Sequence, residues 1–499
     1  MKKFIYLILL TVVSCLVNNQ RSEAQASGFP EKDGLKFSPR WVDNLVFLKG
    51  MGDGISAEKQ MLYKWAEAKL AIPGDSSFSW LGRNAQFQDF CTENKINHLG
   101  GPLLGNISDT SVDVWVRTRK PDSIRVVLTV DGLERSFGPT VTSYDTDLSG
   151  VVRIEGLLPN QAYPYRVFVG DSEIPQPKSA RIRTTDHSLQ STTTIGFGSC
   201  FHRWGLGNKA MINTILDRKP HAFVGLGDIV AQDKLNHIGW HTLDYLSRDL
   251  YPAWNRLVAS VPFYALWDDH DYFGNDLAGI PKGYSDEDRQ RVWKVFKNSW
   301  NNPSYGFEDA GKGVFFRSRV GVVDLIVLDH RYFRTEDSFL GEAQMDWLER
   351  QLLDCKGPFI VLACGTMWSD AVSKGKDSWG AVDPEGRERI FRLIEQHNIK
   401  GVVFISGDRH GSRVFRIPRP SGHEFYEFEV ASLGGLAGPP ASLKEWKDQL
   451  FGLSGGYAFG EFVFDTTQAE ATLTFNLVTD SGNVLHSISL THNDLTPKK

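Results

Sequence analysis

Several apolar segments of this sequence end in side chains that bind metal ions or transfer protons. These segments have the composition of buried strands. In an open α/β sheet, the carboxyl ends of the strands line the crevice where ligands bind. One aspartate after a strand is more often a turn or a helix cap, but several such strand ends together are expected to form one site. The residues concerned are Cys200, Asp228, Asp269, Asp408 and His410.

Carboxylates gathered in this way repel one another and raise their own pKa values. Bound cations remove that repulsion and activate water near neutral pH. We expect Asp228 to bridge two ions about 3.5–4 Å apart, the spacing of two-metal phosphatases. Cys200 has an alternative interpretation as an inert buried thiol. His270 is a candidate acid–base group or a core histidine held by Asp268. Arg331 and Arg409 are candidate phosphate contacts, or they pair with the acidic cluster.

These side chains require a layered scaffold to hold them. A chain of 499 residues suggests two or three domains. The pattern of residues 27–97 predicts a helical preface, that is, a helical segment in front of the later domains. Residues 98–187 alternate with period two between turns, as in an antiparallel β-sandwich. Residues 191–495 combine continuous apolar strands with helical patterns, which predicts an α/β catalytic domain.

The beginning of the chain has the pattern of an export signal. Residues 1–26 combine a basic start with an apolar run too short to span a bilayer. Either Cys15 is lipidated, which we favour, or cleavage follows the small residues at 24–26. The protein is then periplasmic or lipid-anchored to the envelope. A net charge of -5 and a pI of about 6.2 argue against a nucleic-acid-binding surface. The sequence indicates no oligomeric state.

Four short motifs resemble, in order, those of the PhoD-like alkaline phosphatases, a branch of the calcineurin-like metallophosphoesterases. They are residues 197–200 (FGSC), Gly227-Asp228, residues 267–271 (WDDHD) with Asn275, and residues 406–410 (SGDRH). Residues 101–118 resemble the β-sandwich signature of that family, and residues 329–331 its LDxR segment. The resemblance extends from about Gly100 to the C-terminus.

The resemblance implies a four-layer αββα core, and a ferric ion with one or more calcium ions. By position, Cys200 and His410 hold the iron, Asp228 bridges, and His270 assists the leaving group. The ligands of the second metal region are, by the same resemblance, Asp269, Asn275 and Asp408. The sequence departs from the family at Ala231, where a tyrosine ligand is usual. Zinc or manganese therefore becomes an alternative to iron, although the Cys200 thiolate still favours a softer ion than calcium.

We therefore expect an exported, metal-dependent phosphoric ester hydrolase that acts on small-molecule or lipid phosphate esters. A metal-bound hydroxide attacks phosphorus in line. Two alternatives remain open. The first is a phospholipase or cell-wall phosphodiesterase with a narrow substrate range on the same fold. The second is a non-catalytic surface-binding protein with a degenerate site, which the loss of the tyrosine would favour.

Overall fold

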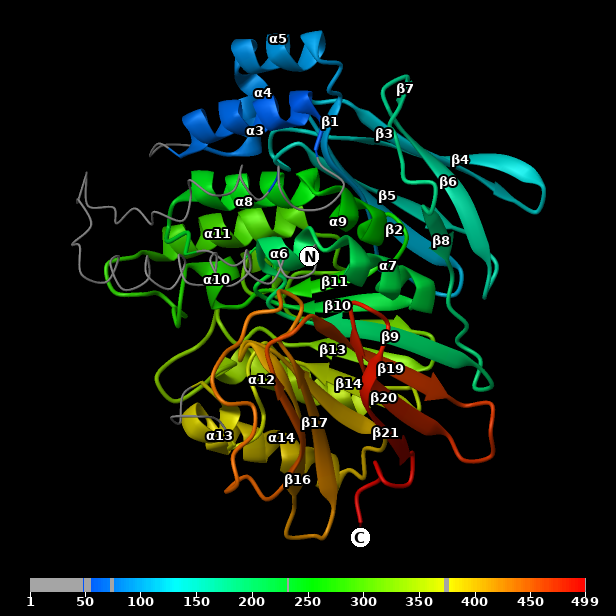
Figure 1. Cartoon of the computed structure of the whole chain (residues 1–499), viewed down its shortest axis with the longest axis vertical. Helices are drawn as coiled ribbons and strands as arrows, with labels where there is room; N and C mark the ends of the chain where they lie inside the picture. Colours follow the sequence, from blue (N-terminus) through cyan, green and yellow to red (C-terminus); the bar gives the residue numbers. More distant parts are fainter. Residues whose placement is uncertain (1–47, 49–54, 72–75, 231–232, 372–376, 499) are drawn as a thin grey trace, which may run out of the picture. The chain divides into compact units, whose positions relative to one another are not determined.

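A computed structural model of the chain describes Leu48 and residues 55–71, 76–230, 233–371 and 377–498 (Figure 1). These residues belong to one unit of the chain, Leu45–Lys499. The predicted signal sequence, Cys15 and Ala231 lie outside the described residues. Within those ranges, no helix has both the length and the apolar composition needed to cross a membrane.

Three helices precede the first strand. They are α3 (Ala57–Leu70), α4 (Phe78–Arg83) and α5 (Ala85–Glu93). The Ser56 hydroxyl caps α3 by accepting the Lys59 amide at 3.4 Å. One face of α3 packs against α8 (Ile238–Leu250). The approach is close, because a Cβ added at Gly239 would lie 1.9 Å from the Leu70 carbonyl oxygen.

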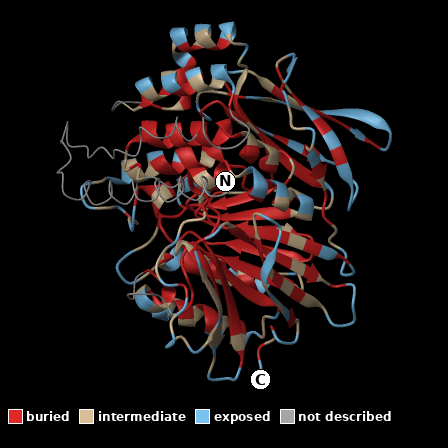
Figure 2. Ribbon diagram, viewed as in Figure 1, coloured by how far each residue is buried: buried red, intermediate tan, exposed pale blue. Residues whose placement is uncertain are grey.

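Two small antiparallel sheets follow. The first has the order β1-β2-β5 and the second β4-β3-β6-β7, with β8 paired to β6. Alternating aliphatic side chains face the core between them, whereas most of β4 is exposed (Figure 2). Their bounds are β1 (His98–Gly105), β2 (Ser111–Thr118), β3 (Ser123–Val130), β4 (Leu133–Val141), β5 (Ser149–Glu155), β6 (Ala162–Val169), β7 (Ser172–Glu173) and β8 (Arg181–Arg183).

The remaining strands form two larger mixed sheets. The first sheet has the order β11-β10-β9-β19-β20-β21, in which β9, β10 and β11 are parallel. Its strands are β9 (Thr192–Gly198), β10 (Ala222–Leu226), β11 (Phe263–Leu266), β19 (Ala458–Asp465), β20 (Thr472–Thr479) and β21 (Val484–Thr491).

The second sheet has the order β12-β13-β14-β15-β17-β16-β18, and β13, β14, β15 and β17 are parallel. Its strands are β12 (Phe316–Val320), β13 (Val323–Val327), β14 (Phe359–Ala363), β15 (Val402–Ser406), β16 (Gly411–Pro418), β17 (Glu424–Val430) and β18 (Gln449–Ser454). The inner faces of the two sheets meet through aromatic contacts, such as Phe428 on Phe462 at 5.0 Å.

Helices cover the outer faces. α12 (Gly341–Asp354) and α14 (Pro384–Gln396) pack on the second sheet through Leu348 and Phe391. On the first sheet, the rings of Trp254, on α9 (Pro252–Val258), and Phe263 have their centroids 5.0 Å apart. The other helices are α6 (His202–Leu206), α7 (Lys209–Arg218), α9 (Pro252–Val258), α10 (Asp269–Tyr272), α11 (Asp286–Ser299) and α13 (Trp379–Val382), with a short 3-10 turn, η2 (Glu308–Ala310). These layers confirm the predicted αββα architecture.

Candidate metal centre

The chemistry-bearing residues follow the carboxyl ends of the parallel strands in both large sheets. Cys200 lies two residues after β9, and Asp228 two residues after β10. Residues 268–271 follow β11, residues 329–331 follow β13, and residues 408–410 follow β15. Because the carboxyl ends of parallel strands share one edge of a sheet, segments more than 200 residues apart converge there.

Three groups of side chains at this edge offer donor atoms that lie within 4.8 Å of one another. The Cys200 Sγ atom lies 3.7 Å from Asp228 Oδ2, so the first two groups adjoin. Asp269 belongs to both the second and the third, so all three form one cluster. The groups are Cys200, His202 and His410; then Asp228, Asp269 and His270; then Asp268, Asp269 and Asp408.

Five of these residues have left-handed backbone conformations. Positive φ is uncommon outside glycine, and where it persists the surrounding structure enforces it, often at functional sites. The loops are held together by backbone hydrogen bonds, such as Cys200 N to Gly227 O at 3.2 Å. The left-handed residues are Cys200 (φ 56°), His202 (47°), Asp228 (55°), Asp408 (75°) and His410 (43°).

The carboxylates here are not compensated by protein cations alone. Burial, together with the charges of Asp269 and Asp268, holds the pKa of Asp228 well above its ordinary value. Burial and the same neighbours raise the pKa of Asp408. The buried Oδ1 atom of Asp228 has no hydrogen-bond partner among the described residues. An unpaired carboxylate oxygen beside thiol and imidazole donors fits a bound metal ion.

Asp268 differs from its neighbours because two cationic side chains contact it. Its Oδ1 atom lies 2.9 Å from His330 Nε2 and accepts the Arg331 Nε–H at 2.6 Å. Burial alone would raise the pKa of Asp268, but Arg331 and His330 bring it below its ordinary value. Arg331 is fully buried and also contacts Asp377 at 3.0 Å.

His270 is poised to carry a proton. Its Nδ1 atom lies 2.9 Å from Asp233 Oδ1. Burial opposes the charged form, yet the carboxylates of Asp269 and Asp228 raise the pKa of His270 to about 10. Without cations on those carboxylates, this pKa favours the protonated imidazole at neutral pH, the form that a general acid requires. The nearby Arg409 guanidinium lies 3.8 Å from Asp408 Oδ2, with 15% of its side chain exposed.

Asp271 and Lys234 hold the loops of the site in place. Asp271 Oδ2 accepts hydrogen bonds from the amides of Asp228 at 2.5 Å and Asp268 at 3.2 Å. The buried Lys234 ammonium contacts Asp244 at 3.1 Å and donates to the carbonyl oxygens of Val230 and His270. These contacts tie the loop after β10 to the helix turn after β11.

A glycine-rich loop, residues 434–438, covers the histidine side of the cluster. A Cβ at Gly434 would lie 2.7 Å from His202 Cδ2, and one at Gly438 would lie 2.6 Å from His410 Cβ. Both contacts are closer than real Cβ atoms allow. Glycine therefore lets this loop pack directly on two donor residues.

The sequence patterns assign neither His202 nor Lys234 to the metal centre. His202 had a usable signal, because it stands two residues after Cys200 at a strand end. Lys234 had none, since its role depends on tertiary contacts. Asn275 is exposed, and its side-chain amide donates to Asp276 Oδ2 at 2.9 Å.

Comparisons with known proteins agree with this geometry. The family model of the PhoD-like phosphatases matches residues 195–475, and a domain of unknown function (DUF7800) matches residues 96–186. Because the first match spans more than half of the sequence, the chain belongs to the PhoD-like phosphatase family. The resemblance predicted from the four motifs is thus confirmed.

Individual relatives extend this finding. Alkaline phosphatase D of Bacillus subtilis (strain 168) is 26% identical over 316 residues, which are 52% of this chain and 53% of the relative. The chain thus spans about half the length of that relative. A solved structure of PhoD is similar with a TM-score of 0.64 and 18% identity, covering 80% of this chain and 91% of that one. A purple acid phosphatase from yellow lupin (Lupinus luteus) seeds has a TM-score of 0.58 and 12% identity, covering 79% and 75%.

Proposed function

We propose that this protein is a metal-dependent hydrolase of phosphate monoesters and diesters. One observation carries the proposal: the buried carboxylate of Asp228, one oxygen of which accepts no hydrogen bond among the described residues, lies within reach of a thiol, imidazoles and further carboxylates. Such a donor set has no structural use without cations, because burying unpaired charge costs free energy. Membership of a phosphatase family supports the same reaction class.

Two sets of ligands follow from the donor groups. Cys200, His202 and His410 would hold one ion, and Asp228 would be shared with the next. Asp269 and Asp408 would hold the second ion, with Asn275 as a further candidate ligand. A thiolate and two imidazoles favour a transition metal such as zinc or iron at the first position, whereas carboxylates suit calcium or manganese. Bound ions at this position supply Lewis acidity and lower the pKa of coordinated water.

The other side chains act on the substrate. The protonated His270 donates its proton to the leaving oxygen, and Asp233 fixes the orientation of the imidazole. Arg409 is proposed to contact the phosphate, because a guanidinium matches phosphate geometry. For Arg331, the pairing with Asp268 and Asp377 favours a role in orienting carboxylates over direct substrate contact.

The organisation of the chain is part of this proposal. We assign residues 98–187 to a β-sandwich domain and residues 191–495 to the catalytic domain, after a helical preface at 27–97. The basic and apolar start of the sequence supports export, with Cys15 as the lipidation residue.

Metal analysis combined with turnover tests the function directly. The purified protein is expected to contain at least two metal equivalents and to hydrolyse p-nitrophenyl phosphate and bis-p-nitrophenyl phosphate. Exhaustive chelation should abolish both activities, and readdition of metal should restore them. Full activity in protein shown to be free of metal would contradict the proposal.

A further inference from the structure

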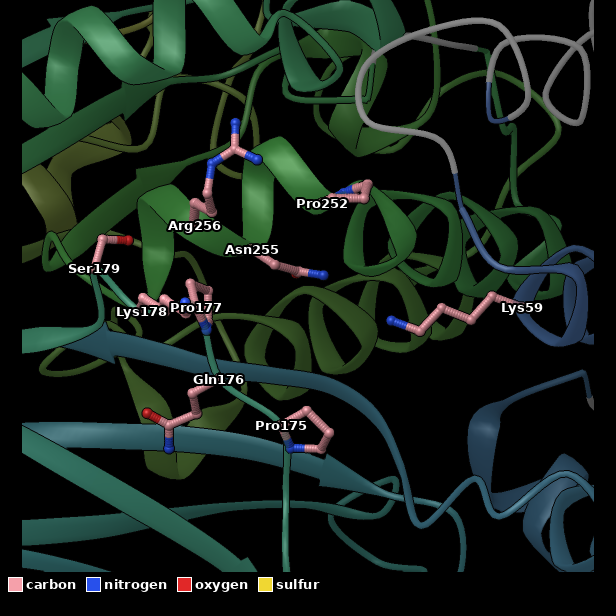
Figure 3. Close-up of a pocket in the computed structure, with 9 residues that line it drawn as sticks. All are labelled: Lys59, Pro175, Gln176, Pro177, Lys178, Ser179, Pro252, Asn255 and Arg256. Atoms are coloured by element: carbon pink, nitrogen blue, oxygen red, sulfur yellow. The ribbon is translucent and has the colours of Figure 1, made fainter.

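Two adjoining cavities lie between the β-sandwich and the outer helices of the first large sheet. The first has a volume of about 500 Å³ and is bounded by residues 175–179, by α9 and by Lys59 of α3 (Figure 3). The second, of about 290 Å³, is bounded by β8, the end of α7 and residues 260–261. Ser179 borders both cavities, and the surface that lines the two of them is called the groove below.

The groove is basic although the whole chain carries a net charge of -5. One acidic side chain, Asp217, stands among those that line it. Within the part of the chain that the structure describes, Lys178, Arg181, Arg183 and Lys219 form no ion pair. The six basic residues that line the groove are Lys59, Lys178, Arg181, Arg183, Lys219 and Arg256.

The positive charges are crowded. Arg181 and Arg183 alternate with the buried Ile182 on β8, so both guanidinium groups project from the same face. Burial and the charge of Arg181 lower the pKa of Arg183. At the other end, burial lowers the pKa of Lys59, and the charge of Asp249 offsets part of that effect. Both oxygens of Asp249 already accept hydrogen bonds from Arg248.

The groove is separate from the metal centre. Residues 216–220 and 260–261 precede β10 and β11, and therefore lie at the amino ends of these strands. The metal-binding groups follow the carboxyl ends of the same strands. A five-residue strand spans about 17 Å, so a bound phosphate in the groove cannot reach the catalytic cluster.

We propose that this groove binds an extended, linear polyanion whose charges are phosphate groups. Guanidinium and ammonium groups along the two cavities match successive phosphates, and the Ser179 hydroxyl adds a polar contact. The site operates independently of hydrolysis at the metal centre.

The binding of inorganic polyphosphate of defined chain length to the metal-loaded, full-length protein tests this assignment. Isothermal titration should show an affinity that rises with chain length and exceeds that of orthophosphate, because several phosphates bind at once. The affinity should fall steeply with added salt. The double variant Arg181→Glu, Arg183→Glu should bind at least about tenfold more weakly, since two attractive contacts become repulsive.

The matched control is Arg350→Glu, Lys400→Glu, which changes the net charge equally at exposed positions outside the groove. It should bind polyphosphate like the parent chain, and circular dichroism should show that both variants are folded. An unchanged affinity in the Arg181/Arg183 variant, or an equal loss in the control, would overturn the proposal. Binding to phosphatidylglycerol vesicles without binding to polyphosphate would assign the surface to a membrane instead.

Discussion

The two ends of the parallel strands β9, β10 and β11 carry opposite chemistry. At the carboxyl ends, buried carboxylates, a thiol and imidazoles are held in left-handed backbone conformations. At the amino ends, lysines and arginines are partly exposed along a groove. Carboxylates are the commonest donor groups in the first cluster, whereas basic side chains are the commonest charged groups in the second.

This contrast separates two ways of binding ions. A metal centre needs donors fixed within a few tenths of an ångström, and strained loops on rigid strands provide that precision. A polyanion needs only a favourable field and several adaptable contacts, which flexible basic side chains supply. Asp268 differs from both, because protein side chains, His330 and Arg331, compensate its charge.

The largest expected effect is that of Asp228→Asn on catalysis. The proposed bridge contributes several kcal/mol of charge stabilisation through the metals, so kcat/KM should fall by at least about a hundredfold. In chelated protein the same substitution should instead raise the free energy of unfolding by about 1–3 kcal/mol, because an unpaired buried oxygen is no longer charged. Steady-state kinetics and urea denaturation measure the two effects. Near-normal turnover would remove Asp228 from the site.

The Lys234→Met variant tests whether Lys234 positions the segment that carries His270. Removing the ammonium takes away the contact that Lys234 makes with the buried Asp244, which should destabilise the fold by roughly 3–5 kcal/mol. The double variant Lys234→Met, Asp244→Asn should recover much of that stability. It should still have a reduced kcat, because the His270 carbonyl oxygen has lost its donor.

Lys294→Met, at an exposed position of α11, is the control for Lys234→Met and should match the parent chain. Thermal unfolding and separate determination of kcat and KM give the readouts. Full recovery of kcat in the double variant would restrict Lys234 to a purely structural role.

The His202→Ala variant tests whether His202, which forms one group of donors with Cys200 and His410, is a metal ligand. Loss of one ligand should weaken metal binding at this group by at least about tenfold, since even outer partners of metal ligands contribute that much. Competition with a chromogenic chelator measures the affinity, and cobalt substitution reports thiolate coordination by absorption. His397→Ala, an exposed histidine after α14, should leave both readouts unchanged. Equal affinity in the His202 variant would exclude this ligand.

The smallest effect is expected at the amino ends of the strands. Burial and the charge of Arg183 lower the pKa of His221 to about 4. Its neutral form is therefore favoured in the folded state, and the associated stability is complete above pH 6.5 and lost as the pH falls towards 4. His221→Asn should reduce the acid-induced decrease in Tm by an amount equivalent to about 1 kcal/mol. Melting curves at pH 7.5 and pH 5 would reveal an equal decrease in both proteins if this pKa were unperturbed.

Much of the fold could be predicted because its physical signals are local. Continuous apolar runs indicated the buried strands, and periodic patterns indicated helices near the observed α11, α12 and α14. The candidate donors Cys200, Asp228 and Asp408 could also be located, since each stands at the end of such a run. Their assignment as metal ligands stays a prediction.

The sequence by itself determined which donor atoms are present, their order and the ends of the strands on which they stand. Tertiary structure decided which of them face one another. It placed His202 beside Cys200 and His410. It also brought Arg331 into contact with two carboxylates, and Lys234 within hydrogen-bond distance of the His270 carbonyl oxygen. Those outcomes depend on the packing of two sheets and on left-handed loop conformations. Neither is encoded in any short stretch of residues, because each arises from contacts between segments far apart in the chain.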